Sequence, residues 1–208
     1  MIDRNLTIAG VIALLLAWAG PLPGLVAGSF AAHMALHMTV VGIGIPLLAA
    51  GIGPLVAQRN WLRSQIALPI AVSILDLVVV WGWHAPALHH ASRTLPWVLA
   101  AEQLSFALVS LLVWLVALAS TTETRRSAAL AGAMALFFTS MHMTLLCALL
   151  GLSPRPLYAG HHDGNGWLGL SPLADQQVGG VVMLAIGGVV YLVGGLMLMA
   201  RVLRRAPA

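Results

Sequence analysis

Six long apolar stretches fill most of this 208-residue sequence and leave little room for other kinds of structure. They lie at roughly 6–27, 30–55, 66–85, 95–119, 127–150 and 178–201. A helix needs about 20 apolar residues to cross the hydrocarbon core of a bilayer, and each stretch reaches that length. Only 8% of the residues are charged, whereas soluble domains carry about 25%. We therefore predict an all-α membrane protein with a single domain, residues 1–208, built as a bundle of about six transmembrane helices.

Prolines interrupt the first two apolar stretches. Pro21 and Pro23 stand near the end of the first stretch, and Pro46 and Pro54 stand in the second. Proline lacks a backbone N–H and its ring clashes with the preceding turn of a helix. We therefore expect these positions to end or kink the two helices.

The arginines predict how the bundle is oriented. All ten basic residues are arginines, and with a cytoplasmic N-terminus only Arg93 and Arg155 fall on the outer side. The other eight fall on the inner side: Arg4, Arg59, Arg63, Arg125, Arg126, Arg201, Arg204 and Arg205. Short cytoplasmic loops of membrane proteins carry such an excess of positive charge. We expect both termini to be cytoplasmic, and this distribution does not indicate a nucleic-acid partner.

With this orientation, every histidine falls toward the outer side of the membrane. The eight are His33, His37, His84, His89, His90, His142, His161 and His162. We expect His33, His37, His84 and His142 to form one site, because polar side chains are costly in hydrocarbon and usually mark function. The other four are expected to lie in loops, where they would only attract an ion.

A helical rise of 1.5 Å per residue places several polar side chains in one layer, about 10–13 Å below the outer surface. These residues are His37, Asp76, Glu102 and His142. Each carboxylate at that depth must orient a ligating imidazole, bind metal directly, or be protonated and packed. Asp175 stands near the start of the last helix, where it is expected to cap that helix or to meet an incoming ion at the outer mouth.

Methionines accompany the candidate histidines. In His33-Met34-Ala35-Leu36-His37-Met38 the two imidazoles share one stripe of a helix, and the two methionines form an adjacent stripe. The segment Met141-His142-Met143 repeats this combination. Thioether and imidazole together favour a soft ion, Cu(I) above zinc. The alternative is simple packing, because methionine also fills irregular space in helix interiors.

Several motifs resemble the CtaG family of cytochrome c oxidase assembly factors. They are the His-Met-x-x-His-Met segment at 33–38, Pro46-Leu47-Leu48-x-x-Gly51, and Trp83-His84-Ala85-Pro86-Ala87-Leu88 followed by Glu102 and Phe106…Trp114. The most specific is Pro156-Leu157-Tyr158 with Leu173-Ala174-Asp175-Gln176-Gln177-x-Gly179-Gly180. The resemblance implies a multi-helix membrane protein needed to mature haem–copper oxidase, and it points to His33, His37, His84, Glu102, His142 and Asp175. The family often has histidine after the glutamate, where this chain has Gln103.

The predicted function is therefore a copper-binding assembly factor in the bacterial inner membrane, with its metal site facing the periplasm or exterior. Its expected partners are lipid and a cytochrome c oxidase subunit or another copper carrier. The alternatives are a haem-binding electron-transfer protein, with His37 and His142 as axial ligands, a copper or proton transporter with Asp76 and Glu102 as a relay, and a structural or accessory subunit without metal. The chain contains no GxSxG, HExxH or glycine-rich nucleotide motif, so we do not expect an enzyme.

Overall fold

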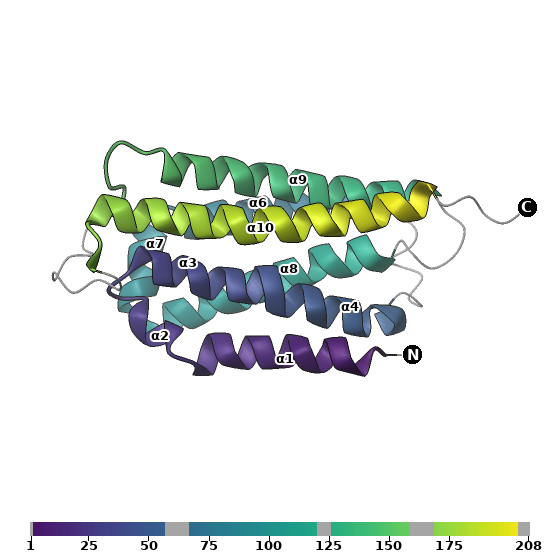
Figure 1. Cartoon of the computed structure of the whole chain (residues 1–208), viewed down its shortest axis with the longest axis horizontal. Coiled ribbons are helices and arrows are strands. Elements are labelled where there is room, and N and C mark those ends of the chain that lie inside the picture. Colours follow the sequence, from purple (N-terminus) through teal and green to yellow (C-terminus); the bar gives the residue numbers. More distant parts are fainter. Residues whose placement is uncertain (1, 57–66, 120–125, 159–168, 204–208) are drawn as a thin grey trace, which may run out of the picture.

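In the computed structural model, residues 2–56, 67–119, 126–158 and 169–203 are described, and every regular element within them is a helix (Figure 1). In chain order these are α1 (Arg4–Ala19), α2 (Leu22–Leu25), α3 (Phe30–Met38), the π-helix η1 (Thr39–Gly44), α4 (Ile45–Val56), α6 (Ala67–Trp83), α7 (Pro86–Thr94), α8 (Pro96–Ala119), α9 (Arg126–Gly151) and α10 (Pro172–Leu203). All six predicted apolar stretches are confirmed as helical.

The described helices fit the predicted number of membrane spans. Five stretches are long and apolar enough to cross a bilayer by length and composition, and α6 with α7 adds a sixth if that bent pair counts as one span. The two helices of the pair meet at 70°, so α7 turns away from the direction of α6. The last helix starts at Pro172, well before the predicted start at 178, and this places Asp175 inside its first turn.

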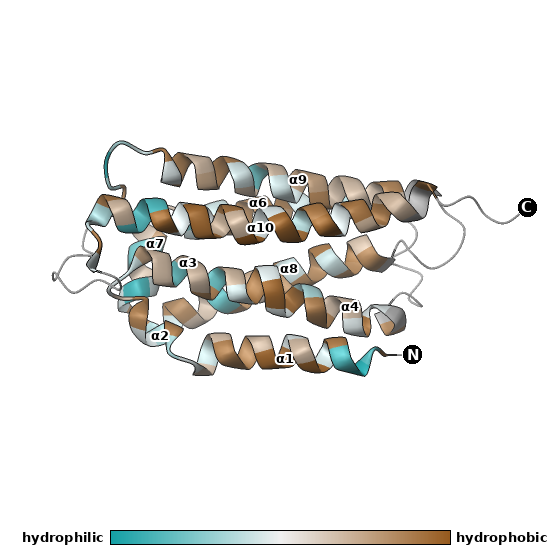
Figure 2. Ribbon diagram, in the orientation of Figure 1, coloured by the Kyte–Doolittle hydropathy of each residue, from teal (hydrophilic) through white to brown (hydrophobic). Residues whose placement is uncertain are grey.

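The helices form one elongated bundle (Figure 1). α9 and α10 lie side by side, α3 packs against α10, and α1 lies at the edge against α4 (Figure 1). α1 begins and α10 ends at the same end of the bundle, as predicted, while the cytoplasmic location of that end stays a prediction. Hydrophilic residues within the bundle gather toward the opposite end, where α3, α8 and α10 begin (Figure 2).

Glycines on α10 allow its neighbours to approach closely. A side chain at Gly180 would lie 2.9 Å from the backbone nitrogen of Gly151 on α9. At Gly187 it would meet the methyl group of Met38 at 3.4 Å, and at Gly194 it would overlap the ring of Trp114. The seven-residue spacing of these glycines therefore does mark a packing face, as the sequence predicts.

Pro21 and Pro46 interrupt their helices as expected, whereas Pro54 lies within α4 and does not end it at that residue. α1 ends at Ala19, and the chain turns through Pro21 and the short α2 before α3 begins. Proline at 46 cannot donate to a carbonyl four residues earlier, and the π-helix η1 ends two residues before it, at Gly44. There the backbone N–H of Ile45 bonds the carbonyl of Val40, five residues back. Single π-turns in helices are frequent beside functional sites, and this one directly follows His37 and Met38.

Candidate metal-binding site

The start of α3 is held by a carboxylate from another helix. The side chain of Asp175, on α10, accepts hydrogen bonds from the Ser29 hydroxyl at 2.8 Å and from the backbone N–H groups of Phe30 and Ala31 at 2.6 and 3.1 Å. It is only 4% exposed. The first N–H groups of a helix have no partners within it and favour negative charge nearby. The expectation that Asp175 caps its own helix is therefore wrong, because it caps α3.

A second contact fixes the turn that leads into α3. The guanidinium of Arg93, on α7, donates to the backbone carbonyls of Val26 and Ala27. Two other helices, α7 and α10, thus determine where α3 begins. They thereby also fix the position of His33, which lies three residues after Phe30 on α3.

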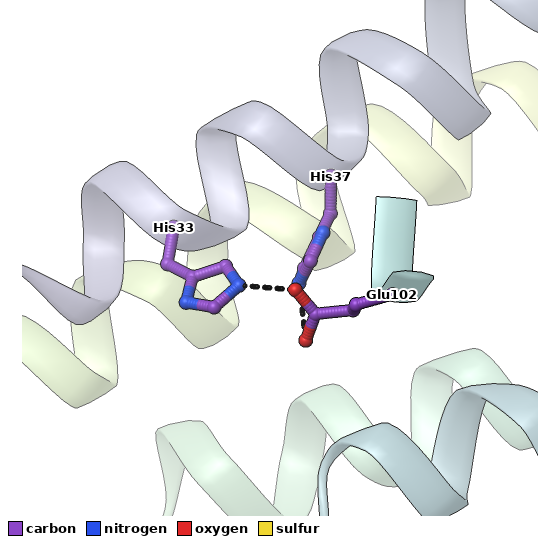
Figure 3. Close-up of side chains that lie close together, drawn as sticks. All are labelled: His33, His37 and Glu102. Carbon is purple, nitrogen blue, oxygen red and sulfur yellow. Dashed lines mark hydrogen bonds and ion pairs between the residues drawn. The ribbon is translucent and has the colours of Figure 1, made fainter. Parts of the chain in front are cut away.

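His33, His37 and Glu102 form a buried group (Figure 3), which we call the outer cluster after the side of the membrane on which it is predicted to lie. The His33 Nε2 atom lies 2.8 Å from one oxygen of Glu102, and the His37 Nε2 atom lies 3.7 Å from the other. One ligand atom from each residue lies within 4.8 Å of the others. The three side chains are between 0% and 3% exposed. The four-residue spacing on α3 does place both imidazoles on one stripe, facing α8 (Figure 3).

The short contact within the outer cluster is a proton bridge. The Nε2 atom of His33 and a carboxyl oxygen of Glu102 share one proton in this hydrogen bond, and either atom can carry it. A metal ion binds deprotonated ligands and releases protons when it is bound. The atoms that now share the proton are therefore the atoms that would bind an ion in its place.

Gln103 supports His37 from the side away from Glu102. Its side-chain amide lies 2.8 Å from the Nδ1 atom of His37. Binding of metal by Nε2 requires a proton on Nδ1, and the amide oxygen can accept that proton once the amide is turned. Gln103 is therefore placed to position the imidazole of His37.

His84 adjoins His37 at the end of α6. The two rings are 5.9 Å apart, and the Nδ1 atom of His84 donates to the carbonyl of Val80 at 2.7 Å. This bond places the proton on Nδ1 and leaves a lone pair on Nε2. Nε2 is buried and has no hydrogen-bond partner in the described part of the chain. His84 is thus prepared to act as a ligand.

A small cavity lies beside His37 and His84, and we call it the thioether cavity. Its volume is about 20 Å³, room for roughly one water-sized occupant. The lining is mostly apolar and comprises His37, Met38, Val41, Asp76, Val80, His84, Phe106, Met143, Met183 and Tyr191. Of the predicted methionines, Met38 and Met143 reach this cavity.

The remaining predicted methionines do not line the cavity. Met34 is buried against Gly179 of α10, and Met141 is 54% exposed on the outside of the bundle. Consecutive residues of a helix point about 100° apart, so Met141 and Met143 cannot both follow His142 inward. Met183 was not predicted, because the glycine-rich α10 sequence around it indicates only packing.

His142 and Asp76 form a separate buried pair. Their side chains meet at 3.1 Å between Nε2 and a carboxylate oxygen. Asp76 lines the thioether cavity, while His142 is not among its lining residues. The predicted layer of four polar residues is therefore split into two pairs, His37 with Glu102 and His142 with Asp76.

His89 is a buried residue that the sequence analysis wrongly assigned to a loop. It lies on α7, is 1% exposed, and stacks on His33 with ring centroids 4.7 Å apart. Phe30 and Tyr158 enclose it at 5.2 and 4.4 Å. Pro86 was the available signal, because proline favours the first turn of a helix, and in a helix from that residue His89 and Ser92 share a face. His90 is on the same helix and exposed, and His161 and His162 lie outside the described residues.

Fold and site together define a multi-pass membrane protein with buried imidazoles and carboxylates gathered toward one end of a helical bundle. The family model of the cytochrome c oxidase caa3 assembly factor (Caa3_CtaG) matches residues 6–205, and the chain belongs to this family. No curated protein and no solved structure gives a significant match.

Proposed function

We propose that this oxidase assembly factor handles copper and that the outer cluster holds the ion. The observation that carries the proposal is the convergence of His33, His37 and Glu102 in a fully buried position. Burying a carboxylate and two imidazoles within a membrane protein costs free energy, and such residues therefore usually mark a functional site. Imidazole and carboxylate ligands suit copper and zinc, and the family's role in oxidase maturation favours copper.

The packing around the cluster favours a bare ion over haem. A haem between His37 and His142 would need a pocket of the size usual for small molecules, about 300–1,000 Å³. The cavity beside His37 has only about 20 Å³, and the Nε2 atom of His142 is bonded to Asp76. The haem alternative therefore has no support from the described helices.

The location of the polar residues favours delivery over transport across the membrane. Buried histidines and carboxylates gather in the half of the bundle away from the N-terminus (Figure 2), whereas a transporter needs a polar path along the whole bundle. With the arginine-rich side in the cytoplasm, the outer cluster faces the periplasm or exterior. We propose that it passes copper, without catalysis, to an oxidase subunit or to another copper carrier.

The test combines metal binding with oxidase maturation. We expect purified wild-type protein to bind copper under reducing conditions, and His37→Ala and Glu102→Gln to bind it much more weakly. In a strain lacking the wild-type protein, the same two variants should leave the caa3 oxidase without its normal absorbance and activity. A competition titration against zinc checks the choice of ion.

The matched control is His90→Ala, which removes an exposed histidine from α7 and should change neither copper binding nor maturation. The proposal fails if wild-type protein binds no copper and the His37→Ala strain assembles active oxidase. Preferred binding of zinc would assign the outer cluster to a different ion and would likewise overturn the proposal.

A further inference from the structure

We propose that the thioether cavity is a second copper station, specific for Cu(I), next to the outer cluster. This inference rests on the proposed copper handling and adds a separate ligand set to it. Three methionines from three elements line the cavity: Met38 at the end of α3, Met143 on α9 and Met183 on α10. His84, at the end of α6, adds an imidazole.

The lining combines three thioethers and two imidazoles with the carboxylate of Asp76, which already contacts His142. The thioethers are the ligands that favour reduced copper. Thioethers are soft ligands that favour Cu(I), while divalent ions such as zinc prefer nitrogen, thiolate and oxygen. A cavity of about 20 Å³ with mostly apolar walls has no room for the water molecules that a hydrated divalent ion keeps. Cu(I) carries a single charge and can be held by sulfur and nitrogen atoms alone.

His84 supplies the observation that distinguishes a ligand site from ordinary packing. Its Nδ1 proton is held by the Val80 carbonyl, so the buried Nε2 atom carries a free lone pair and has no partner among the described residues. Leaving a buried acceptor unpaired is unfavourable. A Cu(I) ion in the cavity would satisfy it, whereas methionine packing alone does not.

His37 connects the two stations. Its Nε2 atom faces Glu102 at 3.7 Å in the outer cluster, and the same residue lines the thioether cavity. An ion held first by His33, His37 and Glu102 could therefore exchange the His33 nitrogen and the Glu102 oxygen for methionine sulfur while His37 stays bound. No covalent bond of the protein changes in this transfer.

The test is the coordination of Cu(I) in the purified full-length protein. We expect the X-ray absorption spectrum of the Cu(I)-loaded protein to show sulfur neighbours. In the double variant Met38→Leu/Met143→Leu these sulfur neighbours should disappear. The affinity for Cu(I) should fall at least about 100-fold. Removing only a hydrogen-bond partner of a ligand costs up to about that much, and this variant removes ligands themselves. Leucine nearly conserves the volume of methionine, so this variant should fold.

Two controls isolate the cavity. Met141→Leu changes a methionine of the same segment that is 54% exposed and should leave the affinity unchanged. His33→Ala removes a residue of the outer cluster and none of the cavity lining, and it should keep the sulfur neighbours. A wild-type protein that binds Cu(I) with nitrogen and oxygen neighbours only, or a double variant with unchanged affinity, overturns this inference while leaving the proposed function intact. A wild-type protein that binds no copper overturns both.

Discussion

Asp175 should stabilise the protein by capping α3 and should not bind the metal. Asp175→Ala leaves the backbone N–H groups of Phe30 and Ala31 without an acceptor in a buried position. Each unsatisfied buried donor costs about 1–3 kcal/mol, so the free energy of unfolding should fall by about 2–6 kcal/mol. Asp175→Asn keeps one acceptor oxygen but leaves at least one of these N–H groups facing an amide NH2, so it should cost about 1–3 kcal/mol, together with the favourable charge at the helix end.

Asp3 provides a matched control for this loss. It caps α1 in the same manner, accepting hydrogen bonds from the backbone N–H groups of Asn5 and Leu6 at 3.1 and 3.2 Å, but it is exposed. Water can replace its oxygen, so Asp3→Ala should cost only about 1 kcal/mol. The expected order of destabilisation is therefore Asp175→Ala, then Asp175→Asn, then Asp3→Ala.

Reversible unfolding in mixed micelles measures these differences, and a copper titration of the folded Asp175→Asn variant tests the other role. We expect that variant to retain the copper affinity of the wild type. The reasoning is refuted if Asp175→Ala unfolds within about 0.5 kcal/mol of the wild type, a change typical of surface substitutions. It is also refuted if Asp175→Asn loses copper binding without losing stability, because that result would make Asp175 a ligand.

Three further substitutions test other contacts. Gln103→Leu should weaken copper binding about 10–100-fold in a competition titration, the usual effect of removing the partner of a ligating imidazole; unchanged affinity would contradict its positioning role. Gly180→Val should destabilise the protein by about 1–3 kcal/mol because it pushes α10 from α9, whereas Gly188→Val, with open space around it, should be tolerated in the same unfolding assay. Burial raises the pKa of Tyr158 above its usual range, so its proton is bound more tightly in the folded than in the unfolded protein. Stability should therefore fall as the pH rises above about 10, and Tyr158→Phe should remove that part of the pH dependence.

The helices could be predicted from the sequence because their signal is local. A run of about 20 apolar residues fixes both the element and its length, and Pro21 and Pro46 mark their own interruptions. Contacts between helices are not encoded locally. Asp175 lies 144 to 146 residues from the groups it caps, and nothing in its own segment indicates that its partner is α3.

The site was predictable to the extent that it follows helical periodicity. The four-residue spacing of His33 and His37 alone predicts that they share a stripe of α3. The helical rise per residue predicts that Glu102 lies at a similar depth. Rotation about each helix axis was not predictable, and it decides which methionines point inward. The same uncertainty hid His89, because the direction of α7 depends on a bend of 70° between α6 and α7.

His37 belongs to both the outer cluster and the thioether cavity, and with copper bound as proposed this shared position would limit how many ions one chain can carry. Its Nδ1 atom is occupied by Gln103, so only Nε2 remains for metal. An ion at one station therefore competes with an ion at the other, and we expect titrations to saturate near one copper per chain. A recipient that needs two coppers would then require two separate loading events, and the number of loaded chains would set the pace of its maturation.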